Sequence, residues 1–546
     1  MDATTLSGLL AQRLGAGPDA LAFIEGERDW TVADFDRAVR QAATWLAEQG
    51  VGPGDRVALW LVNRIEWLIL YFALARRGAT AVAVNTRYRV PEVQHLLGLS
   101  RACLLITQKA FRGIDFPGIV ASLDGAALPA LRKIGLLDAD ADADAGAGAG
   151  ASASAGAPAP QTLLGRPVIV FDLRPDTGGG RRDVPGPADL ARPDAESTLF
   201  ATSGTTRGPK LVVHLQRSAA LHARRCASRY GFDQPDAKLC ALMPFCGTYG
   251  LAAVLGAFAG GAPAVIVDSF EPAATAALFN RQRITHAFCT DDMLSRLGAA
   301  VPGHKPFPSA RVFGFAAFSP GAAEMAAELW ARDIPLFGLY GSSEVWALFG
   351  IQQPDLPLAE RILGGGRTAS PDAEIRIRDL ESGDLLPPGE VGEIELKAPT
   401  NFIGYLDNPK ATAEAILPDG FFRTGDLGYR RADGTFAYLS RRDDAVRLAG
   451  FLVNPAEIED PIKSLAGVAD VQVVAVAVDG RQRAVAFVIP EPGSTPDAAA
   501  LITASAGLMA PYRAPARVWF VETFPTTQGA NGTKVQRGRL REMALA

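Results

Sequence analysis

Short apolar runs alternate with helix-like stretches along the first part of the chain. Residues 56–62 and 80–84 are apolar runs with the length of buried strands, and residues 66–75 between them are apolar on nearly all sides. A buried helix between two strands predicts a βαβ unit, in which the two strands run parallel. Upstream, Thr31 and Asp34 have the spacing of a capping box at the start of an amphipathic helix. This region therefore predicts an α/β fold.

The same alternation continues from residue 199 to residue 340. Helical patterns separate short apolar runs that predict further strands at 239–243, 264–267, 287–290, 312–315 and 336–339. The stretch 239–267 contains no charged residue and is long enough to span a bilayer. Its glycines and prolines, however, divide it into a strand, a buried helix at 251–259 and a second strand. We therefore expect no membrane span.

The pattern changes again toward the C-terminus. Glycine and proline are frequent between residues 364 and 434, which predicts short strands joined by turns. Residues 455–465 then have helical spacing. The runs 471–478 and 483–489 flank Asp479-Gly480, a strong signal for a β-hairpin. The last hundred or so residues therefore have an α+β pattern of their own.

More than one domain is expected, because 546 residues exceed what a single hydrophobic core usually holds. We predict a large N-terminal domain of α/β subdomains plus a β-rich subdomain over residues 1–440. A small α+β C-terminal domain follows over residues 441–546. Within the large domain, residues 138–160 consist only of Ala, Asp, Gly, Ser and Pro, and none of these can anchor a core. We predict that they form a disordered surface loop.

Composition excludes several classes of protein. The net charge of −5 rules out the broad basic face that nucleic-acid binding requires. A hydrophobic content of 48% excludes global disorder. The five cysteines lack the CxxC spacing of metal sites, and their odd number does not suit a disulfide framework. The first residues lack the pattern of a secretory signal, so we expect a reduced, cytoplasmic protein.

The segment from Thr202 to Lys210 is rich in small hydroxyl residues and glycine and directly follows an apolar run. Such a segment can turn backbone N–H groups toward an anion, while the hydroxyls and the lysine add donors. These features suit a polyphosphate, although the Walker pattern is absent. By itself, a run of this composition is more often an ordinary loop. The candidate phosphate ligands are Thr202, Ser203, Gly204, Thr205, Thr206 and Lys210.

Four other segments carry polar groups that suit nucleotide chemistry. Residues 340–344 (Tyr-Gly-Ser-Ser-Glu) follow an apolar run, and a hydroxyl and a carboxylate there could hold phosphate and Mg²⁺. Asp426 lies in a tight turn, from which its carboxylate could accept hydrogen bonds from two ribose hydroxyls. Arg441 and Lys534 belong to two further polar segments. Each residue also has an ordinary alternative, such as a core tyrosine, a turn-forming aspartate or an exposed lysine.

In this order, the five segments resemble the motifs of the adenylate-forming superfamily, which includes acyl-CoA synthetases, nonribosomal adenylation domains and luciferase. The resemblance extends over most of the chain, from Trp30-Thr31 through 52–56 and 85–87 to Lys534. It implies that the small C-terminal domain is mobile. It also implies an acid–thiol ligase that uses ATP and Mg²⁺ to activate a small carboxylic acid and then passes the acyl group to coenzyme A.

The resemblance also implies a role for individual residues. Lys534, Glu344 and Ser343 would be catalytic, and the loop 202–210 would wrap the β- and γ-phosphates of ATP. The remaining implied roles are adenine stacking by Tyr340, α-phosphate contact by Ser343, Mg²⁺ ligation by Glu344, ribose binding by Asp426 and Arg441, a hinge at Asp443, a lining of the thiol tunnel at Gly450, and contact of Lys534 with the carboxylate and the α-phosphate.

The chain departs from the usual family pattern at two places. Arg207 stands where relatives usually have glycine, and residues 314–318 replace a Gly-Gly-Ala-Pro run on the substrate wall. Residues 242–250 contain no acidic side chain, whereas amino-acid-activating domains place an aspartate in this neighbourhood, so a free amino acid is a disfavoured substrate. The candidate acyl-pocket residues are Phe245, Cys246, Tyr249, Phe315 and Phe318, of which the two phenylalanines after Gly314 suit a core equally well.

Three alternative functions stay open at this point. A stand-alone acyl-AMP ligase would load the phosphopantetheine arm of an acyl carrier protein instead of coenzyme A. Since no large insertion separates Glu344 from Asp426, where long-chain acyl-AMP ligases often carry one, coenzyme A is favoured. A luciferase-like monooxygenase has no positive support. An inactive nucleotide-binding regulator is disfavoured by the presence of Lys534, Glu344 and Asp426.

Overall fold

A computed structural model describes residues 3–138, 160–173, 186–202, 209–316, 322–442, 446–448, 451–453, 455–478, 481–529 and 532–545. Several predicted features lie outside these segments. They are residues 139–159 of the low-complexity loop, Ser203 to Thr206, Arg207, Phe318, Asp443 and Gly450. No helix within the described segments is long and apolar enough to cross a membrane, as expected for residues 239–267.

The predicted βαβ unit lies in the middle of the first large sheet. Strands β3 (Arg56–Trp60) and β4 (Thr80–Ala83) pair in parallel, and α3 (Ile65–Arg76) connects them. Residues 65–75 of this helix are all buried, which explains why its pattern is apolar on every side. The strand order is β22-β12-β11-β4-β3-β5-β8-β10-β9. The other strands are β5 (Leu104–Gln108), β8 (Lys133–Leu137), β9 (Thr162–Leu163), β10 (Arg166–Phe171), β11 (Glu196–Ala201), β12 (Leu211–Leu215) and β22 (Gly404–Tyr405).

Helices cover this sheet, and the predicted capping box is present. In α2 (Val32–Glu48), the Asp34 N–H donates to the Thr31 hydroxyl at 3.1 Å, and the Asp34 carboxylate accepts from the Thr31 N–H. The side chains of Phe35, Val39 and Leu46 are buried, so the amphipathic pattern faces the core as predicted. The neighbouring helices are α1 (Leu6–Ala16), α4 (Val90–Ser100), α5 (Phe116–Ala121) and α6 (Gln216–Arg229), with the short hairpin β6 (Ala110–Phe111) and β7 (Ile114–Asp115) between α4 and α5.

The second large sheet has the order β2-β1-β14-β13-β15-β16-β17-β18-β19-β24-β23-β21-β20. Its parallel part contains the strands that the sequence predicted between residues 239 and 340, and α7 (Thr248–Gly260) is the predicted buried helix. The strands are β1 (Leu21–Glu25), β2 (Arg28–Thr31), β13 (Leu239–Ala241), β14 (Ala264–Ile266), β15 (His286–Thr290), β16 (Val312–Ala316) and β17 (Leu336–Tyr340), with helices α8 (Pro272–Gln282), α9 (Asp291–Ala300) and α10 (Ala322–Ala331).

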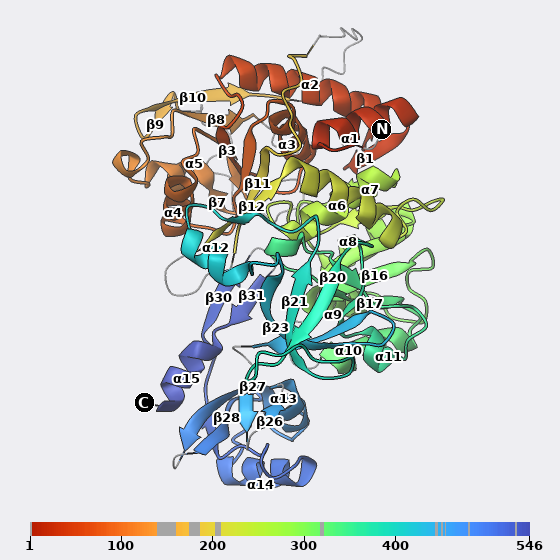
Figure 1. The fold of residues 1–546 in the computed structure, drawn as a ribbon, viewed down its shortest axis with the longest axis vertical. Coiled ribbons are helices and arrows are strands. Elements are labelled where there is room, and N and C mark those ends of the chain that lie inside the picture. Colours follow the sequence, from red (N-terminus) through yellow and green to blue (C-terminus); the bar gives the residue numbers. More distant parts are fainter. Residues whose placement is uncertain are drawn as a thin grey trace.

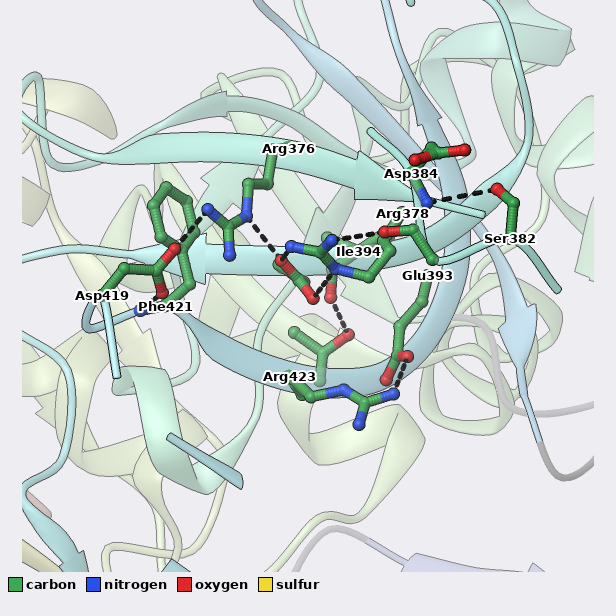
Figure 2. A network of polar contacts seen from close by, with 12 residues as sticks. Arg376, Arg378, Ser382, Asp384, Glu393, Ile394, Asp419, Phe421 and Arg423 are labelled. Atoms are coloured by element: carbon green, nitrogen blue, oxygen red, sulfur yellow. Dashed lines mark hydrogen bonds and ion pairs between the residues drawn. The ribbon is translucent and has the colours of Figure 1, made fainter. Parts of the chain in front are cut away.

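Beyond β17 the same sheet continues with antiparallel strands, as the glycine- and proline-rich region predicted. One face of β20, β21 and β23 carries opposite charges on directly facing residues (Figure 2): Arg376 and Arg423 both face Glu395, and Arg378 faces Glu393. The elements here are β18 (Gly350–Ile351), α11 (Leu358–Arg361), β19 (Gly364–Thr368), β20 (Glu374–Arg378), β21 (Gly392–Lys397), α12 (Pro409–Ala415), β23 (Phe422–Arg430) and β24 (Phe436–Arg441).

The C-terminal elements form a small unit at the opposite end of the molecule from the N-terminus (Figure 1). The predicted hairpin consists of β27 (Val468–Val478) and β28 (Arg481–Pro490), and the predicted helix is α13 (Ala456–Lys463). Two clusters of buried apolar side chains, all from residues 448–544, form its core. The other elements are β25 (Val446–Leu448), β26 (Phe451–Val453), α14 (Ala498–Leu508), β29 (Arg517–Phe520), β30 (Thr526–Gly529), β31 (Gly532–Val535) and α15 (Arg537–Leu545).

Candidate active site

The structure brings three of the predicted nucleotide-binding residues together on neighbouring parts of the second sheet. Tyr340 is the last residue of β17, and Asp426 on β23 directly faces Arg441 at the end of β24. The Tyr340 hydroxyl donates to Asp426 Oδ2 at 2.5 Å, and Arg441 Nε lies 3.0 Å from Asp426 Oδ1. Although β17 is distant in sequence from β23 and β24, the side chains of Tyr340 and Arg441 both contact the carboxylate of Asp426.

Burial and charge define the state of this cluster. The Asp426 side chain is only 5% exposed, and its backbone N–H donates to the hydroxyl of Thr424 two residues earlier. Burial, followed by the Asp426 carboxylate, raises the pKa of Tyr340 well above its ordinary value. The same carboxylate raises the pKa of Arg441. The Tyr340 hydroxyl therefore stays protonated and donates a hydrogen bond to Asp426, and the Arg441 guanidinium forms an ion pair with the same carboxylate.

A short loop after β17 carries Ser343 and Glu344. It forms a 3₁₀ turn, η3 (Ser343–Val345), and ends with Trp346 and Ala347 at φ values of +62° and +47°. A left-handed conformation costs a residue with a β-carbon about 1–2 kcal/mol, so packing must hold the loop in place. The Trp346 ring supplies that packing, since it is fully buried and lies 5.5 Å from the ring of Phe200.

Two buried histidines complete the surroundings of this loop. The His214 ring on β12 lies 4.6 Å from the Trp346 ring, and its Nε2 is 2.7 Å from the carbonyl oxygen of Ser343. Because that acceptor is a carbonyl, Nε2 carries the proton and donates. Burial lowers the pKa of His214 to about 4 and the pKa of His222, which stacks on Trp346, to about 3. Both rings are neutral near pH 7, and His214 fixes the backbone at Ser343.

The side chain of Tyr405 contacts both Glu344 and Lys210, the residue at the end of the phosphate loop. The Tyr405 hydroxyl donates to Glu344 Oε1 at 2.9 Å, while Lys210 Nζ lies 4.7 Å from the centre of the Tyr405 ring. Thr202 and Lys210 stand at the two ends of the loop, where the Thr202 N–H donates to the Lys210 carbonyl at 2.9 Å. The structure thus links Lys210, at the end of the phosphate loop, through Tyr405 to Glu344, the carboxylate that the family resemblance assigns to Mg²⁺.

The predicted acyl pocket is divided by the second sheet. Phe245, Cys246 and Tyr249 are buried on one face, where the Tyr249 hydroxyl donates to the carbonyl groups of Cys289 and Gly314 at 3.2 and 3.3 Å. Phe315 is buried in a different cluster, because adjacent residues of β16 point to opposite faces. Phe315 therefore lies apart from Phe245, Cys246 and Tyr249, and its place in the acyl pocket stays a prediction.

Several residues near the site were not predicted from the sequence. Tyr405, His214 and Trp346 each lie in an apolar or aromatic context that resembles ordinary core. A histidine inside the apolar run 211–215 was the one available signal, since a buried polar ring needs a hydrogen-bond partner.

The predicted catalytic residue Lys534 has its backbone in β31, where it pairs with Thr527 of β30.

Comparison with known proteins identifies the family of the chain. The model of the AMP-binding enzyme family matches residues 10–406, and the model of the AMP-binding enzyme C-terminal domain matches residues 457–530. The chain belongs to the AMP-binding enzyme family. A CoA ligase of Mycobacterium tuberculosis is 30% identical over 560 residues, which cover 99% of both chains. The 3-hydroxybenzoate/4-hydroxybenzoate CoA ligase of Thauera aromatica is 29% identical and covers 98% of this chain and 96% of its own.

Solved structures of other family members have the same fold. ATP-bound MatB from Rhodopseudomonas palustris superposes with a TM-score of 0.79 at 24% identity, over 100% of this chain and 99% of its own. The AMP complex of the o-succinylbenzoate CoA synthetase from Bacillus subtilis gives a TM-score of 0.76 at 23% identity, over 98% of each chain. The protein is thus an enzyme of the AMP-forming acyl-CoA ligase family, with a large N-terminal AMP-binding domain and a small C-terminal domain.

Proposed function

We propose that this enzyme activates a carboxylic acid with ATP to an acyl adenylate and then forms a thioester with coenzyme A, releasing pyrophosphate and AMP. The observation that carries the proposal is the convergence of Tyr340 and Arg441 on the buried Asp426. A carboxylate offers about four acceptor positions, so Asp426 retains capacity for two ribose hydroxyls beside these donors. The Tyr340 ring beside it offers a face for adenine.

The groups around Glu344 suit the triphosphate. Thr202 and Lys210 lie at the two ends of the phosphate loop, and His214 on β12, the strand that follows Lys210, holds the backbone of Ser343 in place. An attacking carboxylate and a triphosphate repel each other, so adenylation needs donors and cations where negative charge accumulates. Lys210 supplies one such cation, and Lys534 from the small domain supplies another on this proposal. Aligning the two substrates contributes the rest of the rate enhancement.

Glu344 also fits a magnesium ion. Its carboxylate is partly buried, and one oxygen accepts a hydrogen bond from the Tyr405 hydroxyl, whose ring also contacts Lys210. Mg²⁺ commonly binds one or two carboxylates together with substrate phosphates and water, so a single glutamate suffices. When bound, the ion supplies positive charge to the phosphates. Glu344 would hold it, and Tyr405 would keep the carboxylate in place.

The acid is proposed to be a simple carboxylic acid that is not an amino acid. Cys246 and Tyr249 are buried in one cluster, Tyr249 donates to the Gly314 carbonyl, and residues 242–250 contain no carboxylate to pair with an ammonium group. Ligases of hydroxybenzoates, ferulate and 2-succinylbenzoate are among the relatives, which supports both an aromatic or alkyl acid and CoA as the acceptor. Asp443 and Gly450 are proposed as the hinge and the thiol tunnel of the second step.

The test is ATP–pyrophosphate exchange with a panel of aliphatic and aromatic acids, followed by thioester detection with CoA and with a phosphopantetheinylated carrier protein. Lys534→Ala should lower exchange at least ~100-fold while leaving thioester formation from supplied acyl-AMP within a few-fold of wild type. Lys463→Ala, which removes a lysine paired with Asp470 in the same domain, is the matched control. The proposal would be overturned if none of the acids supported pyrophosphate exchange, or if Lys534→Ala lost both steps equally.

A further inference from the structure

Tyr405 occupies a position that two separate segments, β12 and α12, hold in place. It forms, with Gly404, the two-residue strand β22, which pairs with Val212 and Val213 of β12. The Tyr405 N–H donates to the hydroxyl of Thr412 at 2.9 Å. The strand is possible because Gly404 has a φ of +148°, where an added β-carbon would also lie 2.8 Å from Thr412. The backbone of Tyr405 therefore has little freedom to move.

The side chain of Tyr405 contacts two groups of opposite charge. Its hydroxyl donates to Glu344 Oε1 at 2.9 Å, and Lys210 Nζ lies 4.7 Å from its ring centre, within the range of a cation–π interaction. The ring itself packs against Phe402, with the ring centres 5.1 Å apart. One rigid residue therefore connects the end of the phosphate loop with the carboxylate expected to bind a divalent cation.

The hydroxyl of Tyr405 is the donor in its contact with Glu344, because a carboxylate oxygen accepts hydrogen bonds. Its proton is therefore directed at Glu344 Oε1. A carboxylate held at one oxygen has a fixed rotamer, and its second oxygen remains oriented for a cation.

We propose that Tyr405 is a positioning residue for the first step: its hydroxyl orients Glu344 for a divalent cation, and its ring holds Lys210 beside that carboxylate. This inference rests on the proposed function, because it assumes that Glu344 and Lys210 serve a metal-bound triphosphate. Groups that orient a metal-binding carboxylate typically change metal affinity 10–100-fold when removed. A role in packing alone would predict no such change, because phenylalanine preserves the contact with Phe402.

Tyr405→Phe and Tyr405→Leu separate the two contacts. With Tyr405→Phe, the Mg²⁺ concentration for half-maximal pyrophosphate exchange should rise about tenfold, while kcat at saturating Mg²⁺ and the KM for the acid stay within about twofold. Tyr405→Leu also removes the ring, so the KM for ATP at saturating Mg²⁺ should rise several-fold beyond that of Tyr405→Phe. The control is Tyr429→Phe, because Tyr429 is also half-buried and its ring faces a cation, Arg431.

A binding measurement keeps this test independent of turnover. Mn²⁺ affinity in the presence of a non-hydrolysable ATP analogue, measured by electron paramagnetic resonance of free Mn²⁺, should weaken about tenfold in Tyr405→Phe. That result would support the inference even if no acid in the panel is activated, in which case only the proposed function fails. Wild-type Mn²⁺ affinity in a folded Tyr405→Phe protein would overturn the inference. Absence of nucleotide-dependent Mn²⁺ binding in the wild type would overturn both.

Discussion

His214 and His222 are buried polar residues that stabilise the Ser343–Ala347 loop without facing a substrate. His214 donates to the Ser343 carbonyl, and both rings contact Trp346. Their neutrality is set by burial, which lowers the pKa of His214 to about 4 and the pKa of His222 to about 3. A third buried histidine, His286, has its pKa lowered to about 4, mainly by burial. The loop that carries Ser343 and Glu344 therefore depends on rings that must stay unprotonated.

This dependence predicts a loss of stability in mild acid. An unfolded histidine titrates near pH ~6.5. Because the folded pKa values are lower, their contribution to stability is complete above that pH and is lost as the pH falls from about 6.5 toward 4. Each buried histidine should lower the free energy of unfolding at pH 5 by about 2 kcal/mol relative to neutral pH.

His222→Phe keeps a ring against Trp346 but cannot be protonated, so the fall in the free energy of unfolding between pH 7 and pH 5 should shrink by roughly a third. Urea unfolding at both pH values measures this. His304→Gln, at an exposed position, should leave the fall unchanged. An unchanged fall in His222→Phe would show that His222 is not a source of the acid sensitivity.

Site residues of an unusual type or position could be predicted from the sequence, whereas site residues that resemble ordinary core residues could not. Asp426 and Arg441 were candidates because charged residues in a strand-and-turn context need a reason, and the structure brings them together. Tyr405 and Trp346 gave no such signal, since an aromatic residue in a glycine-rich segment is as often packing as chemistry. The importance of Tyr405 comes from its contact with Glu344, and that of Trp346 from its contacts with Phe200 and His214, all of them distant in the sequence, and sequence spacing does not show tertiary contacts.

At the scale of elements, the charged face of β20, β21 and β23 stabilises the sheet that carries Asp426 (Figure 2). Glu395 is fully buried and accepts from both Arg376 and Arg378. Burial alone would raise the pKa of Glu395, but hydrogen bonds from the two guanidinium groups outweigh it and hold the pKa below its ordinary value. Its contribution to stability is therefore present at neutral pH and is lost only as the pH falls through that lowered value.

Glu395→Gln should lower the free energy of unfolding by about 2 kcal/mol at pH 7, since two partly buried guanidinium groups lose their counter-charge. Urea unfolding monitored by circular dichroism measures the change in the free energy of unfolding. Glu374→Gln on the same strand pair removes an exposed carboxylate that pairs with Lys397 at 3.7 Å, and it should cost no more than about 0.5 kcal/mol. Equal effects of the two substitutions would contradict a special role for the buried glutamate.

Elements were predictable where a local pattern determines them, but their order in the sheets was not. The strands at 56–60 and 80–83, the helix between them and the C-terminal hairpin follow from periodicity and turn residues. By contrast, β1 pairs in parallel with β14, and β22 extends the first sheet by pairing with β12. These pairings join residues that lie far apart in the chain, and only the packing of the whole core selects them.

For the whole molecule, the region between the two domains matters most. Arg442 is the last described residue before Asp443, and its guanidinium lies 3.4 Å from the buried carboxylate of Glu393, which Arg423 also contacts at 2.7 Å. The chain is therefore anchored to the large domain immediately before the predicted hinge. Rotation about Asp443 would leave this anchor in place.

Asp443→Pro should test that hinge, because proline fixes φ near −65° and restricts the preceding residue. We expect thioester formation from supplied acyl-AMP to fall at least ~10-fold more than pyrophosphate exchange, as a rotation that serves the second step is restricted. Asp443→Ala keeps the backbone free and should leave both rates within a few-fold of wild type. Unchanged thioester formation in Asp443→Pro would place the hinge elsewhere.

The cysteines have a consequence for measuring such a rotation. All of them are buried: Cys103, Cys226, Cys240, Cys246 and Cys289. Burial raises the pKa of Cys246 to about 11 and the pKa of Cys289 to about 12, so their reactive thiolate forms are scarce at neutral pH. The native enzyme should thus react slowly with maleimide dyes. New cysteines at exposed Glu414 on α12 and Ala506 on α14 could then carry a donor–acceptor pair, and domain movement could be followed in single molecules without removing any natural thiol.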